Sequence, residues 1–384
     1  MCIRAHLGSA ALALSLALPA AASAADRQPA QPLFFVTAVG SAGTMAQAIN
    51  NAGTVVGNIL PSSSPGAPEG YRAFINNGFG MRELGTLGGA GSYVTALNDA
   101  GQVLGVAQTS SGESLPFLYS GGSMTSLGTL GGISTGVTGI NNSGYVVGYS
   151  YPPEDPDPTI DTGPRAVLYP PGGTIRTVGN LPFPNPYSSA ADINEDGDIV
   201  GYSGPFGPGD APYYPFLFAD GVMTRLGDIG GSFNAATALN DFGQVVGYVS
   251  LPNELHDRHA FLYADGVLTD LDGRSSPSYS IANDINNLGQ VVGASDVLGA
   301  FIYEGNRMQS LNAMIDPSGG WRLESAHSIN EIGQIAATGF KDGQYYALRL
   351  DPVPEPSGMA MTLAGLLLAG VVARGTKRPP SGAA

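Results

Sequence analysis

The segment DINEDGDIVGYS, residues 192–203, has the residue types and spacing that come closest to a metal site in this sequence. Oxygen-bearing side chains occupy the first, third, fifth and seventh places of a twelve-residue calcium loop: Asp192, Asn194, Asp196 and Asp198. The twelfth place, where a bidentate glutamate belongs, is Ser203. The same segment is a regular copy of a hairpin that recurs along the chain, and the missing ligand favours the hairpin. We expect no metal cofactor here.

Two other groups of side chains are weaker metal candidates. The segment ELHDRH, residues 254–259, offers His256 and His259, but no third ligand is evident and His259 begins an expected strand. The loop YPPEDPDPTIDTGP, residues 151–164, holds four acidic residues: Glu154, Asp155, Asp157 and Asp161. Long insertions tend to carry function, but a solvated acidic loop is the simpler interpretation.

Tyrosine follows a Val-Gly or Val-Val-Gly segment in three consecutive repeats, at Tyr149, Tyr202 and Tyr248. Equivalent positions of neighbouring repeats lie at the same level, so we expect these rings to gather on one side of the fold. Long aromatic loops at 151–164 and 202–214 follow two of them. Aromatic rings that carry a hydroxyl can bind sugars. These tyrosines are our candidate site for a carbohydrate or a protein, and ordinary packing of strand ends is the alternative.

Motifs of catalysis are missing from the sequence. It has no Gly-x-Ser-x-Gly elbow and no phosphate loop, and the only cysteine is Cys2, near the beginning of the chain. Carboxylate pairs for glycoside hydrolysis can still assemble from different repeats, facing each other across a channel roughly 5–10 Å apart. We expect a non-catalytic protein, with a glycoside hydrolase or lyase as the alternative.

Seven copies of an Asn-x-x-Gly hairpin position these side chains. The turn asparagine can accept a hydrogen bond from the backbone two residues on, and the glycine supplies the left-handed conformation of the loop. These asparagines are therefore expected to be structural. They recur at intervals of 43 to 53 residues, the size of a propeller blade: Asn50, Asn98, Asn141, Asn194, Asn240, Asn286 and Asn330.

Two further strand types also recur seven times, one resembling HAFLY (259–263) and one that usually ends in Leu-Gly. The chain begins with the second type, FFVTAVG at 34–40, and ends with the first, YYALRL at 345–350. Elsewhere these two types are joined in a hairpin. A closed ring would pair the terminal strands and remove both exposed edges. We therefore predict an all-β, seven-bladed β-propeller of four-stranded blades over residues 33–350, closed by its N- and C-terminal strands.

Composition agrees with a repeat protein rich in turns. Among 384 residues there are 56 glycines and 29 prolines, and only 12% are charged. The net charge of −15 would repel a polyphosphate, so we expect no nucleic-acid partner. Residues 1–25 have the form of a signal peptide, with Arg4, an apolar run and small residues around Ser23–Ala25. The sequence predicts export.

The tripeptide His259-Ala260-Phe261, together with LGTLGG and Asn-x-x-Gly segments elsewhere, resembles the bacterial extracellular HAF repeat family. The resemblance runs from about residue 33 to residue 350. The literal tripeptide occurs once, and other copies read RAF, PFL, RAV or GAF. The family brings no settled activity to this sequence.

The tail resembles a PEP-CTERM sorting signal, which a membrane protease called exosortase handles in Gram-negative bacteria. Residues 351–358 form a proline-rich linker, and residues 359–378 hold an apolar segment and a basic end. The apolar run is short for a bilayer span, and positive charges would hold its end on the cytoplasmic side. The residues that match the signal are Pro354, Glu355, Pro356, Arg374, Lys377 and Arg378.

The resemblance implies an exosortase-type protease as a partner and transient contact of the tail with the inner membrane. Such sorting systems accompany exopolysaccharide production, so it also implies an extracellular polysaccharide, or a surface protein, as the ligand. We expect an exported, monomeric propeller at the cell surface or outside the cell, acting as a binding or matrix module.

Overall fold

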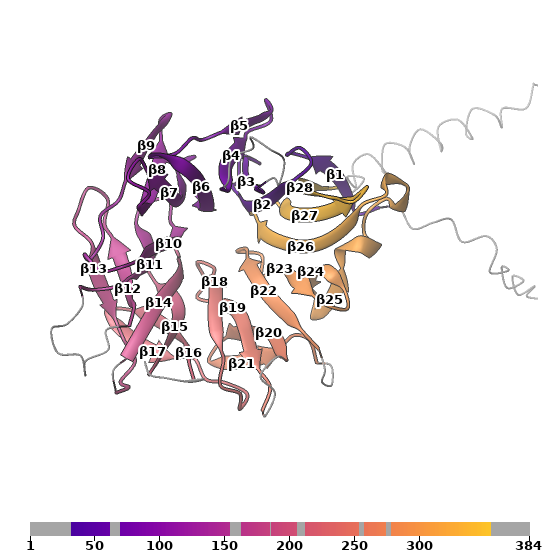
Figure 1. The fold of residues 1–384 in the computed structure, drawn as a ribbon. Helices are drawn as coiled ribbons and strands as arrows, with labels where there is room; N and C mark the ends of the chain where they lie inside the picture. Colours follow the sequence, from indigo (N-terminus) through magenta and orange to yellow (C-terminus); the bar gives the residue numbers. More distant parts are fainter. Residues whose placement is uncertain are drawn as a thin grey trace, which may run out of the picture. The chain divides into compact units, whose positions relative to one another are not determined.

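The computed structural model describes residues 32–354 except 62–69, 154–162, 185, 206–211, 253–256 and 274–277. The described residues form seven antiparallel sheets of four strands each, which follow one another from indigo to yellow in Figure 1. The fold is therefore the predicted seven-bladed β-propeller.

Each blade begins with the strand that lines the central channel. Blades 1 to 3 consist of β2 (Thr44–Ile49), β3 (Val55–Ile59), β4 (Arg72–Asn76), β5 (Met81–Glu83); β6 (Gly88–Leu97), β7 (Val103–Thr109), β8 (Ser114–Ser120), β9 (Ser123–Ser126); and β10 (Thr135–Ile140), β11 (Val146–Ser150), β12 (Arg165–Tyr169), β13 (Arg176–Gly179).

Blades 4 to 6 consist of β14 (Pro186–Ile193), β15 (Ile199–Pro205), β16 (Tyr214–Ala219), β17 (Val222–Arg225); β18 (Ala235–Leu239), β19 (Val245–Ser250), β20 (Arg258–Ala264), β21 (Val267–Asp270); and β22 (Ser280–Ile285), β23 (Val291–Ser295), β24 (Gly299–Glu304), β25 (Arg307–Ser310). Two 3₁₀ helices, η1 (Leu311–Ala313) and η2 (Pro317–Gly319), precede blade 7, which consists of β26 (Arg322–Ile329), β27 (Ile335–Lys341), β28 (Gln344–Pro352) and β1 (Phe34–Ala38).

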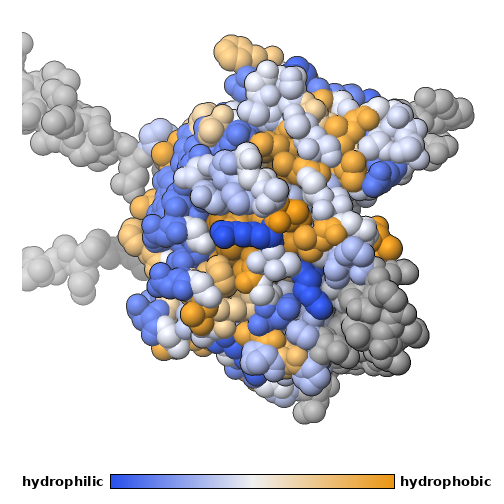
Figure 2. Space-filling model, turned by 90° about the vertical axis from the view of Figure 1, so that its left-hand side faces the viewer, coloured by the Kyte–Doolittle hydropathy of each residue, from blue (hydrophilic) through white to orange (hydrophobic). Residues whose placement is uncertain are grey.

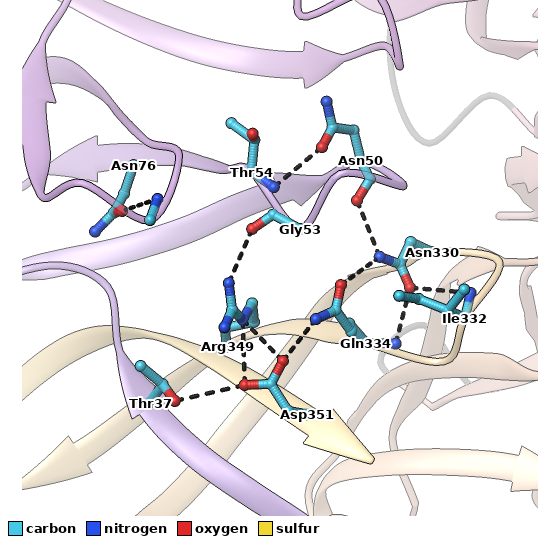
Figure 3. A network of polar contacts seen from close by, with 11 residues as sticks. Thr37, Asn50, Gly53, Thr54, Asn76, Asn330, Ile332, Gln334, Arg349 and Asp351 are labelled. Carbon is cyan, nitrogen blue, oxygen red and sulfur yellow. Dashed lines mark hydrogen bonds and ion pairs between the residues drawn. The ribbon is translucent and has the colours of Figure 1, made fainter. Parts of the chain in front are cut away.

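Blade 7 closes the ring with strands from both ends of the described chain. Strand β1 pairs antiparallel with β28, from Phe34 opposite Pro352 to Ala38 opposite Leu348. This confirms the predicted pairing of the terminal strands, which leaves neither strand as a free edge. Figure 3 shows the polar contacts that extend the closure into blade 1, including Arg349 Nη1, which donates to the carbonyl of Gly53 at 3.2 Å.

The turn of each hairpin has the predicted chemistry. In blade 1, Asn50 Oδ1 accepts hydrogen bonds from the backbone of Ala52 at 3.1 Å and of Thr54 at 3.0 Å. Gly53 has a φ of 73°, and its N–H bonds to the Asn50 carbonyl at 2.9 Å. The glycine is needed because this left-handed conformation is costly for residues with a Cβ.

Hydrophobic contacts hold neighbouring blades together. Seven buried clusters lie between successive blades, and the one between blades 7 and 1 includes Ala336, Ala347, Val39 and Phe74. On the side of the molecule that Figure 2 shows, hydrophobic and strongly hydrophilic residues alternate over the surface. The core is thus distributed around the ring, one part for each interface.

Candidate functional site

Tyr149, Tyr202 and Tyr248 lie on the second strands β11, β15 and β19, near the ends that lead away from the Asn-x-x-Gly turns. All three side chains are partly buried. The structure therefore places the three predicted residues at one level of three adjacent blades, at the end of the ring opposite the hairpin turns.

Tyr213, which precedes β16, connects two of these tyrosines. Its ring centroid lies 5.1 Å from that of Tyr202, and its hydroxyl lies 3.2 Å from the hydroxyl of Tyr248. Phe233 packs edge-on against the same ring at 5.4 Å, and the guanidinium of Arg258 lies 4.6 Å from the centre of the Tyr248 ring. Tyr213 is thus the centre of an aromatic cluster that joins blades 4 and 5.

Blades 3 and 4 extend the cluster on its other side. Tyr149 meets Tyr151 edge-on at 6.5 Å, and Tyr187 meets Tyr202 edge-on at 6.1 Å. The Tyr149 ring covers Gly136 on the neighbouring first strand, where a Cβ would come within 2.5 Å of its Cε1. We call the six residues Tyr149, Tyr151, Tyr187, Tyr202, Tyr213 and Tyr248 the tyrosine cluster.

Burial determines the protonation of this cluster. It raises the pKa of Tyr202 above the ordinary value for a phenol, and it does the same for Tyr187 and Tyr248. The neighbouring phenols add smaller contributions in the same direction. These hydroxyls therefore stay neutral, and each can donate one hydrogen bond and accept others.

At the opposite end, the turn asparagines form a closed belt that the sequence did not reveal. The side-chain Nδ2 of each donates to the backbone carbonyl of the corresponding asparagine in the next blade, at distances between 2.9 and 3.3 Å. Aspartate would serve the turn equally well, so the use of asparagine in all seven copies was the available signal.

A second ring of hydrogen bonds surrounds the belt. The residue after each asparagine donates its backbone N–H to the side chain of its equivalent in the next blade, at 2.7 to 3.2 Å. These residues line a cavity of about 270 Å³ at the channel mouth. The members of this second ring are Asn51, Asp99, Asn142, Glu195, Asp241, Asn287 and Glu331.

The channel interior holds two carboxylates and a histidine around a cavity of about 300 Å³. Burial raises the pKa of Asp192 to about 7, with a further contribution from Asp284, and raises the pKa of Asp284 to about 6. Burial also lowers the pKa of His327 to about 4. Asp192 Oδ2 accepts from the backbone of Leu239 at 3.2 Å, and Asp284 Oδ2 from that of Ile329 at 2.9 Å. Both carboxylates thus bind backbone N–H groups of the next blade.

The segment with calcium-loop spacing is an ordinary hairpin between β14 and β15. Asn194 Oδ1 accepts from the backbone of Asp198 at 2.8 Å, and Gly197 donates to the Asn194 carbonyl. In the part of the chain that the structure describes, no group of three or more His, Cys, Asp or Glu side chains is arranged to hold a metal ion.

His259 is engaged at both ring nitrogens. Nδ1 lies 2.7 Å from Asp270 Oδ2, and Nε2 lies 2.9 Å from Ser278 Oγ. This is the hydrogen-bond order of a Ser-His-Asp triad. However, Ser278 is only 3% exposed, and its Oγ also lies 3.3 Å from Asp272 Oδ2. The arrangement therefore reads as a buried structural network, and it leaves His259 no free nitrogen for a metal.

The remaining predicted residues fall at the limits of the described chain. Pro354 is the last residue described, and Glu355, Pro356, Arg374, Lys377 and Arg378 lie outside the described residues. So do residues 1–31, His256 and the four acidic residues of the 151–164 loop. Within the described ranges, no helix is both long enough and apolar enough to cross a membrane.

Comparison with known proteins gave structural matches only. No family model and no curated protein matches the chain. Similar solved structures include TolB from Acinetobacter baumannii (15% identity, TM-score 0.41, covering 78% of this chain and 64% of that one) and an acylaminoacyl peptidase from Pyrococcus horikoshii (10%, 0.47, 84% and 54%). AofleA from Arthrobotrys oligospora is another (11%, 0.40, 73% and 88%). The chain spans less than two thirds of the first two proteins, and we draw no conclusion about function from these similarities.

Proposed function

We propose that this protein is an exported, surface-associated binding or matrix module whose ligand is an extracellular polysaccharide. The observation that carries the proposal is the tyrosine cluster, in which neutral phenols from three blades lie in mutual contact at one end of the propeller. Partly buried tyrosines combine an apolar ring face with a polar hydroxyl, which suits the alternating C–H and O–H groups of a sugar.

The contacts within the cluster also fix its shape before a ligand arrives. The hydroxyl pair of Tyr213 and Tyr248 and the Arg258 guanidinium hold the rings in place. Binding to fixed side chains loses less conformational entropy than binding to side chains that must first be ordered. The same contacts belong to the alternative in which the rings serve packing alone, so the experiment must separate stability from binding.

The test is co-sedimentation of the purified protein with the exopolysaccharide of its own host. We compare the wild type with a triple variant, Tyr149→Ala, Tyr202→Ala and Tyr248→Ala, and with the corresponding triple phenylalanine variant, which keeps the rings. Tyr145→Ala, at the hairpin end of the ring, is the matched control. Loss of binding in the alanine variant at an unchanged fold would support the proposal. No binding by the wild type would remove it.

A glycoside hydrolase or lyase is the second candidate, favoured by Asp192 and Asp284 in one channel cavity. Carboxyl groups with raised pKa values serve as general acids in such enzymes. Release of reducing ends from the polysaccharide, abolished by Asp192→Asn or Asp284→Asn, would establish this function. Intact polysaccharide after prolonged incubation would exclude it for that substrate.

We further propose that an exosortase-type protease processes the tail at the cell surface, with transient contact to the inner membrane. The support is the resemblance of residues 353–378 to a sorting signal. Mass spectrometry of the surface-extracted protein tests it. A C-terminus close to Pro354 supports processing, whereas recovery of peptides from the basic end in the surface fraction contradicts it.

A further inference from the structure

A pocket of about 190 Å³ lies between blades 1 and 2 and belongs to none of the sites described above. Its walls include Tyr71 and Tyr93, which are 48% and 41% exposed, and the side chains of Gln108 and Ser114. Pockets for drug-sized ligands commonly measure roughly 300–1,000 Å³, so this one suits a single small ring.

The glycine-rich start of β6 creates the pocket. Gly88 pairs with Thr109 and Ser92 with Ala107, so three residues of β6 stand opposite the single residue between them on β7. The resulting bulge brings Gly91 against blade 1, where a Cβ would lie 3.2 Å from the carbonyl oxygen of Tyr71. Bare backbone therefore forms part of the wall and lets a ligand approach closely.

The lining of the pocket is polar but uncharged. Among the residues that the structure describes, Gln108 and Ser114 make no side-chain hydrogen bond, and no charged side chain lines the cavity. Two aromatic rings beside an amide and a hydroxyl fit a ligand with apolar C–H faces and neutral hydroxyl groups. A carboxylated sugar would find no cation here, and it would meet a protein of net charge −15.

The pocket also adjoins the tyrosine cluster. Tyr149 lies close enough to Tyr93 to raise its pKa, in addition to the larger effect of burial. Aromatic rings therefore continue from the pocket at blades 1 and 2 to Tyr149 and Tyr202 at blades 3 and 4. A chain molecule held by one unit in the pocket would have further rings along its path.

We propose that this pocket binds one neutral hexopyranose unit of a glycan chain whose neighbouring units lie along the tyrosine cluster. The inference rests on the proposed binding function and names the class of sugar it recognises. Stacking on Tyr71 or Tyr93 orients the unit, and Gln108 and Ser114 hydrogen-bond to its hydroxyl groups.

Saturation-transfer NMR with the methyl glycosides of glucose, galactose and mannose, and with glucuronate, tests the pocket directly. Co-sedimentation with the host polysaccharide is measured in parallel on the same proteins. The pocket variants are Tyr93→Ala, Gln108→Ala and Ser114→Trp, the last of which fills the mouth without removing any wall. Tyr93→Phe keeps the ring, and Tyr145→Ala is a tyrosine removed at the far end of the propeller.

We expect at least one neutral glycoside to give a signal that Ser114→Trp abolishes and Tyr145→Ala leaves intact. Affinity for the polysaccharide should fall about tenfold in Tyr93→Ala and less in Tyr93→Phe. The alanine variant of the tyrosine cluster should keep the glycoside signal while losing polysaccharide. A melting temperature within the range of the control variant confirms that each variant is folded.

The two proposals fail differently. If wild type and Ser114→Trp bind polysaccharide equally, the pocket inference is wrong and the binding function stands. If glycosides bind but no polysaccharide does, the proposed function is wrong and the pocket stands. A response to glucuronate alone overturns the neutral class, and no response to any sugar or to polysaccharide removes both.

Discussion

The side-chain amide of Asn330 donates to the backbone carbonyl of Asn50 at 2.9 Å, although 280 residues separate them in the chain. Asn330 uses the same side chain twice, because its Oδ1 accepts from the backbone of Ile332 and Gln334 within its own turn. Figure 3 shows both sets of contacts, with Asn330 lying between Gln334 and Asn50. One residue type thus shapes the hairpin and joins the last blade to the first.

Replacing Asn330 by aspartate should separate these two roles. Asn330→Asp keeps the acceptor that the turn needs but removes the donor, and it places a carboxylate oxygen against the Asn50 carbonyl. Because both groups are buried, we expect a loss of about 1–3 kcal/mol in the free energy of unfolding. Urea denaturation followed by circular dichroism measures it.

Asn142→Asp is the matched control, since the side chain of Asn142 is exposed beside the same belt. We expect it to cost less than Asn330→Asp. Equal losses in the two variants would mean that the inner belt contributes nothing beyond the turn itself.

The glycine of the second strand should tolerate no side chain. In blade 5, a Cβ on Gly247 would lie 2.1 Å from the carbonyl oxygen of Ala235 and 2.9 Å from Cε1 of Phe261. The backbone atom cannot move away cheaply, so Gly247→Ala should destabilise the protein by about 1–3 kcal/mol or more. Thermal unfolding measures the loss.

Gly128→Ala is the control, because nothing lies within 4 Å of its added Cβ. Blade 7 suggests a partial rescue, since Ala337 replaces this glycine there and Leu348 replaces the phenylalanine. Adding Phe261→Leu to Gly247→Ala should relieve the ring contact but not the backbone contact. A double variant less stable than the sum of the single changes would contradict this account.

The fold was predictable because its information is repeated. Seven turns with the same asparagine and glycine define the blade length, and the complementary terminal strands specify closure. The period of the sequence and the pairing of β1 with β28 therefore follow from local patterns alone. No long-range contact had to be guessed for this part.

The site was less predictable because its contacts cross between blades at positions that do not repeat. The three strand-end tyrosines were visible in the sequence, but Tyr213 and Tyr187 lie just outside the repeated segments. The pocket between blades 1 and 2 depends on a bulge, which moves Gly91 by register and not by residue type. Such features become visible only when the blades are placed side by side.

Asp192 should give the stability a characteristic dependence on pH. Burial raises its pKa to about 7 from an ordinary value of 3.8, so the folded state binds more protons than the unfolded state between these values. The free energy of unfolding from this group therefore falls as pH rises from about 4 to about 7 and is constant above that. Asp284, with a pKa of about 6, acts in the same direction.

His327 opposes this trend. Its pKa of about 4 lies below the ordinary 6.5, so its contribution falls as pH is lowered through that window. Asp192→Asn removes only the aspartate part. We expect the melting temperature of the variant, relative to wild type, to rise steadily between pH 4 and pH 7. Parallel profiles over this range would show that Asp192 does not carry the dependence.

The network of His259 allows a test between structural and catalytic roles. The order Ser278, His259, Asp270 resembles a hydrolytic triad, yet Ser278 and His259 are 3% and 1% exposed. A buried serine cannot reach a substrate, so a fluorophosphonate probe should leave Ser278 unlabelled in the folded protein. His259→Ala should instead lower stability by about 2–4 kcal/mol, because it opens a cavity and leaves buried polar groups unpaired. His259→Asn, which can replace part of the hydrogen bonding, should cost less. Labelling of Ser278 that His259→Ala abolishes would reverse the assignment and make this network an active site.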